Sequence, residues 1–412
     1  MEEKKESKKP NIKEKVSKAE ELKFGFLEVL ILILITALVT VTVTITVNKI
    51  GNHEPILKTY NKDIEKFTEE YNFILSKYYG QVDSETLIKN AIAGMVNNLD
   101  DPYSTFISDE NVTNFDVELD GEFYGLGVEI TINANSEIEV YSVLDGYEAK
   151  KSGIQKGDII THMDGESIQG LSTAEFRSRM IENNHENVTL TIKRNSEVKD
   201  ITVKRTLVQI ESVKTETYKS GNAKVGYIGI TIFASNTYKQ FKEALAKLEA
   251  ENIDSLIVDV RSNSGGHLSV VTDVISEFLD SKHVIYQVKD STGVVKEYST
   301  GKTTKTYDII VLIDGASASA SELLASALKE QYGAKLLGTK SFGKSTVQQV
   351  VDLENGAKYK ITIKEWLTSE GNVINGKGLD PDVEVILGEE YFKNPVPEND
   401  NQLQEAIKLL KK

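Results

Sequence analysis

The stretch between residues 225 and 331 alternates short apolar runs with amphipathic segments, and this pattern constrains the fold more than any other feature. Residues 225–233, 255–260 and 308–313 have the character of buried strands, while residues 238–250, 268–279 and 319–331 have that of helices. Strands that alternate with helices indicate an α/β core with a largely parallel sheet. Sites in such sheets gather where loops leave the carboxyl ends of the strands. We therefore expect the Gly265-Gly266 loop and the turn around Ser319 to belong to a functional site.

That turn contains three alternating serines, Ser317, Ser319 and Ser321, and a lysine follows 25 residues after Ser319. A serine hydroxyl becomes a good nucleophile when a base takes its proton, and a lysine amine kept neutral by burial can be that base. None of the five histidines lies in a local serine-hydrolase signature. Taken alone, Ser319 is equally well explained as a helix N-cap that pairs with Glu322 in a capping box, and Lys344 as a solvated lysine. The choice among the three serines stays open at this point.

Five motifs occur in a defined order along the chain. They are LDDPYSTF at 99–106, DVRSNSGG at 259–266, SASASE at 317–322, TKSFGKSTVQ at 339–348 and NQLQEA at 401–406. In this order the chain resembles the C-terminal processing peptidases, or tail-specific proteases, over about residues 60–412. The resemblance implies a crotonase-like topology for the α/β core and the activity of a serine endopeptidase.

The same resemblance assigns roles to individual residues. It implies that Ser319 is the nucleophile, Lys344 the general base and Gln348 the group that orients the lysine. Two positions depart from the family pattern, because Ser345 follows the lysine where the family usually has glycine, and Ser264 stands where it commonly has proline. Neither departure removes a reacting group.

Cleavage of a peptide bond develops negative charge on the carbonyl oxygen, which requires hydrogen-bond donors aimed at it. The backbone N–H of Ala320, directly after the nucleophile, and an N–H of Gly265 or Gly266 are the candidates for this oxyanion hole. Outside this context the glycine pair would be interpreted simply as a turn.

Residues 111–206 form a region of short strands and turns that resembles a PDZ domain. In that module a glycine-containing loop, here Tyr124-Gly125-Leu126-Gly127, binds the terminal carboxylate of a peptide that adds a strand to the sheet. A β-bulge is the alternative explanation for these glycines. The later pattern Gly153-x-x-x-Gly157-Asp158 favours the PDZ interpretation.

The composition excludes several classes of function. The net charge of −15, without a basic stripe in the globular part, argues against a nucleic-acid partner. The absence of cysteine excludes disulfides, thiolate metal sites and a cysteine nucleophile. We expect neither a metal nor a cofactor.

Residues 29–47 are an uncharged, predominantly apolar run of 19 residues, which is long enough to cross a bilayer as a helix. Its second half alternates like a β-strand, which is the competing interpretation. Eight lysines precede the run, so the positive-inside rule puts the N-terminus in the cytoplasm and the rest of the chain outside the cell membrane. No small-residue cleavage site follows, which favours a retained single-pass anchor.

The predicted organisation is a cytoplasmic tail (1–28), a membrane anchor (29–47), a helical segment (55–110), a PDZ domain (111–206), a protease core (207–394) and a C-terminal helix (395–412). The resemblance adds a homodimer contact through the N-terminal helices. The predicted function is a membrane-anchored, exported serine peptidase with a Ser-Lys dyad that selects proteins by their free C-terminal tails. The alternatives are a membrane-tethered PDZ binding module without activity and a crotonase-type acyl-CoA enzyme.

Overall fold

The computed structural model describes residues 56–183, 185–290, 293–302, 304–353 and 356–410. The predicted cytoplasmic tail and membrane anchor lie outside these residues. Among the described helices, none has both the length and the apolar character needed to cross a bilayer. The chain divides into two compact units, Met1–Leu87 and Ile88–Lys412.

Helices α2 (Ile56–Lys77) and α3 (Ser84–Asn97) form the helical segment that the apolar periodicity predicts. Asp83, rather than Ser84, caps α3, because its carboxylate accepts hydrogen bonds from the backbone N–H of Glu85 at 3.1 Å and the hydroxyl of Thr86 at 2.6 Å. Several large apolar side chains of α2 are exposed, namely Ile64, Phe67, Phe73, Ile74 and Leu75.

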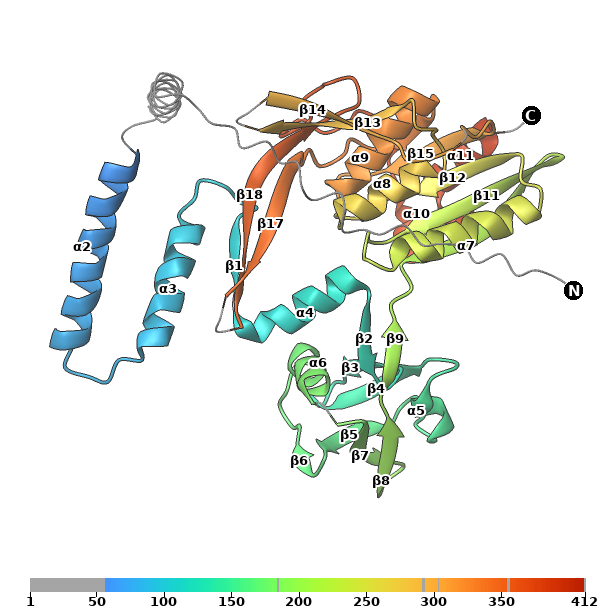
Figure 1. The fold of residues 1–412 in the computed structure, drawn as a ribbon. Helices are drawn as coiled ribbons and strands as arrows, with labels where there is room; N and C mark the ends of the chain where they lie inside the picture. Colours follow the sequence, from blue (N-terminus) through green and yellow to red (C-terminus); the bar gives the residue numbers. More distant parts are fainter. Residues whose placement is uncertain (1–55, 184, 291–292, 303, 354–355, 411–412) are drawn as a thin grey trace, which may run out of the picture. The chain divides into compact units, whose positions relative to one another are not determined.

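A six-stranded sheet forms the centre of the second unit (Figure 1). Its order is β10-β11-β12-β15-β16-β19, with bounds Val213–Ser220, Ala223–Ile230, Ser255–Asp259, Asp308–Ile313, Lys335–Gly338 and Val383–Glu384. All pairings are parallel except β10 with β11, which are joined by a tight antiparallel turn. This is the largely parallel α/β core that the alternation predicts.

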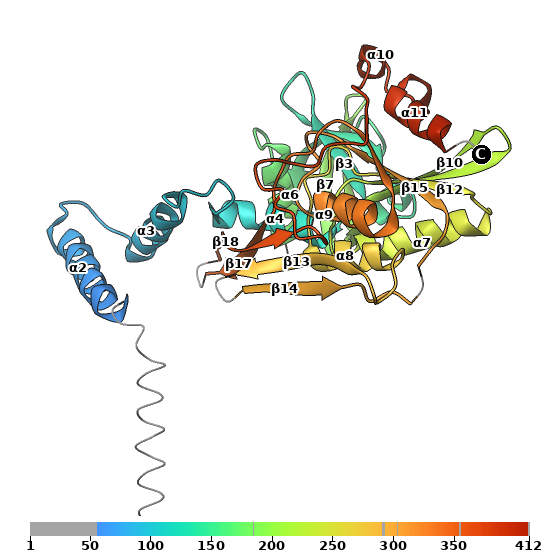
Figure 2. The same ribbon diagram turned by 90° about the horizontal axis from the view of Figure 1, so that it is seen from above.

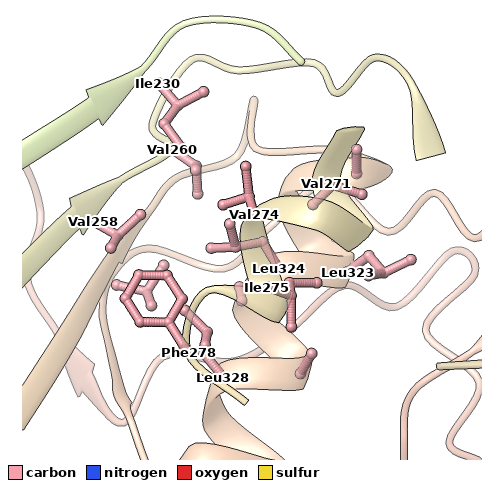
Figure 3. Packing of buried hydrophobic residues seen from close by; sticks show 14 of the residues in the cluster. Ile230, Val258, Val260, Val271, Val274, Ile275, Phe278, Leu323, Leu324 and Leu328 are labelled. Atoms are coloured by element: carbon pink, nitrogen blue, oxygen red, sulfur yellow. The ribbon is translucent and has the colours of Figure 1, made fainter. Parts of the chain in front are cut away.

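The two faces of this sheet bury alternate residues of each strand, as the period of two requires. On one face, Val258 and Val260 pack with α7 (Thr237–Ala250), α8 (Leu268–Ser276) and α9 (Ala320–Ala327). Figure 3 shows this layer, in which strand side chains meet Val274 and Ile275 of α8 and Leu324 of α9.

The opposite face of the sheet is covered by the C-terminal helix α11 (Asn401–Leu409), which follows the short helix α10 (Glu389–Lys393). Leu403, Ala406 and Ile407 of α11 pack on Ile257 and Leu312 of the sheet. Helix α11 also lies beside β10 (Figure 2). Chain segments far apart in sequence are thereby packed around the carboxyl ends of β12 and β15.

A second, antiparallel sheet provides the loop that carries Lys344. Its strands are β1, β18, β13 and β14 in that order, with β17 also paired to β18. Their bounds are Thr105–Ile107, Lys358–Leu367, Val284–Asp290, Gly293–Tyr298 and Thr346–Asp352. Trp366 of β18 is buried in the same core as α9, which joins this sheet to the α/β layer.

The PDZ-like region has its own sheet, β3-β4-β5-β7-β8 with β6 on β5, and its own core. The strands are Val128–Ile132, Ile138–Val143, Ile159–Met163, Asn187–Arg194, Glu197–Lys204 and Glu166–Ser167, and the helices are α5 (Glu148–Lys151) and α6 (Thr173–Glu182). Phe176 and Met180 of α6, which were candidates for groove residues or for core, are 4% exposed and belong to the core.

Two chain crossings connect this region to the core. Helix α4 (Asp109–Asp120) leads into β2 (Glu122–Gly125), and β2 pairs with the returning strand β9 (Thr206–Gln209). The turn after α4 is held by the carbonyl of Gly121, which accepts hydrogen bonds from the N–H of Ile210 at 2.8 Å and from Asn236 Nδ2 at 2.5 Å.

Candidate active site

Ser319 lies in the turn between β15 and α9 and is the N-cap residue of α9. Its backbone has φ 56° and ψ −114°, a strained conformation for a residue with a side chain. The turn is held by Ser317, whose N–H donates to Asp314 Oδ1 at 3.0 Å, and by the N–H of Leu323, which donates to the carbonyl of Ser319 at 2.9 Å. A strained serine between a strand and a helix is typical of an exposed nucleophile.

The three alternating serines have different surroundings. The hydroxyl of Ser317 donates to the carbonyl of Val260, and that of Ser321 to the carbonyl of Asn263, each at 2.8 Å. Both side chains are fully buried, whereas Ser319 lines a cavity. The geometry therefore separates two structural serines from a serine that is open to a substrate, a distinction that the sequence left open.

Six residues predicted for the catalytic site line one cavity of about 380 Å³: Gly265, Gly266, Ser319, Ala320, Lys344 and Gln348. They come from the β12–α8 loop, the start of α9 and the β16–β17 region. Residues separated by more than 80 positions in the chain are thus gathered at one point.

Lys344 projects from a turn after Gly343, a residue with φ 92°. Burial lowers the pKa of the Lys344 ammonium, and the positive charge of Lys360 lowers it further, against the opposing charges of Asp101 and Glu322. Lys344 Nζ also lies 4.6 Å from the centroid of the Tyr103 ring. This is the environment that a lysine needs in order to act as a base.

Within the described chain, no hydrogen bond joins Lys344 Nζ to Ser319 Oγ. The two residues line the same cavity, and contacts between a base and its nucleophile commonly shorten when the substrate is bound.

Glu322 connects the serine turn to the lysine turn. Its Oε2 accepts hydrogen bonds from the N–H of Ser319 at 2.9 Å and of Lys344 at 2.8 Å, and its Oε1 accepts from the N–H of Gly343 and the hydroxyl of Ser341, each at 2.6 Å. The side chain is fully buried. The sequence identified Glu322 only as half of a capping box, because the partners 19–22 residues away are brought together by the fold.

The candidate oxyanion donors differ in their availability. The N–H of Gly265 donates to Asn263 Oδ1 at 2.9 Å, so it is already committed. The N–H groups of Gly266 and Ala320 have no acceptor in the described part of the chain. A Cβ added at Gly265 would lie 3.0 Å from Ser319 Cβ, so glycine is needed where this loop meets the nucleophile turn.

Asn263 is a site residue that the sequence reasoning missed. Its side chain is fully buried, and Nδ2 donates to the carbonyl of Ile230 at 2.9 Å. Its own carbonyl accepts from the N–H of Ala318 at 3.0 Å. Asn263 therefore ties the glycine loop to the serine turn, and no local sequence signal announces this contact.

Gln348 lines the cavity from β17. Its Nε2 donates to Thr346 Oγ1 at 2.7 Å and to Thr362 Oγ1 at 3.2 Å. These bonds fix the amide group, and within the described chain none of its hydrogen bonds goes to Lys344.

The four residues predicted for peptide binding lie outside the catalytic cavity. Tyr124 is 59% exposed and Leu126 is buried. The carbonyls of Leu126 and Gly127 accept bonds from the N–H of Ala149 at 3.1 Å and Leu144 at 2.9 Å, whereas their own N–H groups have no acceptor in the described chain. A Cβ at Gly127, where φ is 81°, would lie 2.2 Å from Tyr147 Cβ.

Three family models match the chain. The peptidase family S41 model matches residues 224–385, the PDZ domain model residues 116–193, and the model of the N-terminal domain of the activating protease CtpB residues 35–111. The first two therefore fall on the region that contains Ser319 and Lys344 and on the region that contains the Tyr124–Gly127 loop.

Two curated relatives align with most of the chain. A probable CtpA-like serine protease of Staphylococcus aureus (strain COL) is 34% identical over 343 residues, which are 82% of this chain and 68% of that protein. The carboxy-terminal processing protease CtpB of Bacillus subtilis (strain 168) is 33% identical over 352 residues, which are 85% of this chain and 72% of that protein. A solved photosystem II D1 C-terminal processing protease aligns at 24% identity with a TM-score of 0.47, covering 83% of this chain and 90% of that one. On the evidence of its family models and its relatives, the chain belongs to the S41 family of C-terminal processing proteases and is a CtpA/CtpB-like serine-type peptidase with a PDZ domain.

Proposed function

We propose that this peptidase cleaves its substrates with Ser319 as the nucleophile and Lys344 as the general base. One observation carries the proposal: a serine held at positive φ and a lysine whose pKa is lowered by burial line the same cavity. Neutral Lys344 takes the proton of Ser319 Oγ as that oxygen attacks the peptide carbonyl. The resulting ammonium then protonates the departing amine, and Lys344 again acts as base when water releases the acyl group.

The N–H groups of Gly266 and Ala320 are the proposed oxyanion donors, since the N–H of Gly265 is bonded to Asn263. The N-terminus of α9 adds a favourable field for the developing negative charge. Gln348 is proposed to orient Lys344 through the oxygen of its amide, because its nitrogen is bonded to Thr346 and Thr362.

A fluorophosphonate probe tests this proposal directly. The wild-type protein should be labelled at Ser319 and should cleave an unfolded protein, while Ser319→Ala should do neither and should retain its fold. Membership of the S41 peptidases sets aside an acyl-CoA enzyme, and labelling would also exclude an inactive PDZ binding module. Absence of both labelling and cleavage in the wild-type protein would overturn the dyad.

We further propose that the PDZ domain selects substrates by their free C-terminal tails. The N–H groups of Leu126 and Gly127 are unpaired donors in the described chain, which suits a terminal carboxylate. Helix α4 supports a link to catalysis, because Phe115, Glu118 and Leu119 line the catalytic cavity just before the chain enters the PDZ domain. The carbonyl of Leu119 also accepts from the N–H of Ser235 at 2.9 Å and lies 3.1 Å from His267 Nε2.

The proposed setting is the outer face of the cell membrane, with residues 29–47 as a single anchor. The support is the sequence itself: an uncharged run of spanning length preceded by eight lysines.

A homodimer through the N-terminal helices is proposed from the exposed apolar side chains of α2, among them Ile64, Phe67 and Ile74. The double variant Ile64→Glu and Phe67→Glu should sediment as a monomer if the wild-type protein is a dimer. A dimer of unchanged affinity in this variant would exclude α2 as the contact.

A further inference from the structure

The guanidinium of Arg261 is held by two carboxylates from opposite ends of the catalytic domain. Its Nε lies 3.0 Å from both oxygens of Asp259, which ends β12, and its Nη2 lies 2.6 Å from Asp259 Oδ2. The same group donates to Asp400, from Nη1 to Oδ1 at 3.1 Å and from Nη2 to Oδ2 at 2.8 Å. All three side chains are largely buried, with Asp400 only 4% exposed.

Asp400 is also the N-cap of the C-terminal helix α11, where its Oδ1 accepts from the N–H of Leu403 at 2.9 Å. Gln402 adds a bond of 2.7 Å from Arg261 Nη1 and is itself anchored to the carbonyl of Val385. Because the apolar face of α11 packs on the central sheet, Asp400 is presented to Arg261 from a fixed position.

Arg261 in turn begins the loop that leads to the oxyanion donor Gly266. The next residue, Ser262, has φ 57°, and its N–H donates to Asp314 Oδ1 at 3.0 Å. Asn263 then binds the N–H of Gly265 and the N–H of Ala318, next to the nucleophile. Five residues therefore separate a buried arginine from the oxyanion donor, and each of the contacts along them is directional.

We propose that Asp400 is a positioning residue for catalysis, which holds the Gly265-Gly266 loop in place through Arg261. Burial by itself lowers the pKa of Arg261, but the hydrogen bonds and charges of Asp259 and Asp400 outweigh it and keep the group charged. Without Asp400 one side of a buried cation has no counterion, a situation that is relieved when the side chain and its loop move toward water. Such a movement displaces the N–H of Gly266 from the reacting carbonyl.

This inference rests on the proposed dyad and is tested with Asp400→Ser. Serine keeps the N-cap acceptor of α11 but removes the carboxylate that pairs with Arg261. We expect kcat and the rate of fluorophosphonate labelling to fall at least about tenfold, because oxyanion donors stabilise the transition state. KM for an unfolded protein should stay within about twofold, because substrate binding is not the step that loses a contact.

A matched control separates positioning from loss of stability. Asp382 likewise accepts a backbone N–H, that of Leu336 at 2.8 Å, and pairs with one cation, Lys329, at 2.7 Å, but it lies away from the oxyanion loop. Asp382→Ser should lower the melting temperature without reducing the labelling rate of the folded protein. Asp400→Asn, which is closer in shape, serves as the second variant if the serine variant does not fold.

The outcomes are distinct. Wild-type labelling together with equally fast labelling of Asp400→Ser or Asp400→Asn would overturn the positioning role while leaving the dyad intact. A loss in Asp382→Ser equal to that in Asp400→Ser would assign the effect to stability and would also overturn it. A wild-type protein that is not labelled contradicts the dyad itself.

Discussion

The backbone N–H of Lys344 donates a hydrogen bond of 2.8 Å to the buried carboxylate of Glu322. The same carboxylate oxygen accepts the N–H of Ser319, so one side chain sets the separation of the two residues proposed to react. Since the carboxylate accepts four hydrogen bonds with no water exposure, its position is determined by the fold.

Glu322→Gln is expected to lower kcat by about 100-fold, because an amide nitrogen cannot accept the hydrogen bonds on its side and a misplacement of about 1 Å has an effect of this size. It should also lower the free energy of unfolding by about 2 kcal/mol. Steady-state kinetics and thermal unfolding measure the two effects. Ser326→Ala removes a buried hydroxyl elsewhere on α9 and serves as the control. A Glu322→Gln enzyme with wild-type kcat would show that the carboxylate does not set the geometry.

Lys344→Arg should abolish cleavage although it preserves the charge, because a guanidinium does not give up its proton in a protein. The assay is the cleavage of an unfolded protein, with circular dichroism to verify the fold. Lys340→Arg, at an exposed lysine paired with Asp380, should cleave normally. Cleavage by Lys344→Arg near the wild-type rate would exclude lysine as the base.

The pH dependence of kcat should report the Lys344 pKa. Lys344 is a base only when neutral, so the rate should rise as the pH increases through this pKa. The charge of Lys360 lowers the pKa of Lys344, and Lys360→Gln should therefore move the rising limb to higher pH. Lys360→Arg keeps the charge and should keep the limb in place. A limb at the same pH in the wild-type and Lys360→Gln proteins would mean that Lys344 does not control it.

Amidation of a substrate's C-terminus should reduce its cleavage at low concentration by about tenfold, which corresponds to about 1.4 kcal/mol of lost binding. The reason is that the unpaired N–H groups of Leu126 and Gly127 complement a negative charge. The labelling rate with a small fluorophosphonate should be the same with either peptide absent. Equal cleavage of the amidated and free-acid peptides at all concentrations would show that the PDZ domain does not recognise C-termini.

The membrane topology can be measured on intact cells. Added protease should digest the chain after residue 48 and should spare an epitope fused to Met1. The physical reason is the excess of lysine before the apolar run. Digestion of the C-terminal domain only after lysis would reverse the proposed orientation.

Much of the fold follows from local patterns. The strand predicted at 308–313 coincides with β15, and the helix predicted at 238–250 differs from α7 by one residue. The helix predicted at 319–331 is instead α9 followed by a π-helical turn, Leu328–Tyr332, that ends at Gly333 with φ 87°. Periodicity identifies a buried face, but the pitch of the last turn depends on what it packs against.

The amino-acid sequence alone determined the alternation of strands and helices, the order of the motifs and the residue types that can react, because these depend on composition and short-range spacing. Tertiary structure decided which serine is open to a substrate, since Ser317 and Ser321 are bonded to carbonyls of a neighbouring loop. It likewise decided that Gly265 is a committed donor, that Glu322 joins two turns, and that Asp400 reaches Arg261 from 139 residues away. Each of these contacts joins segments distant in the chain, and their distances are set by the packing of the whole sheet, which no local pattern encodes.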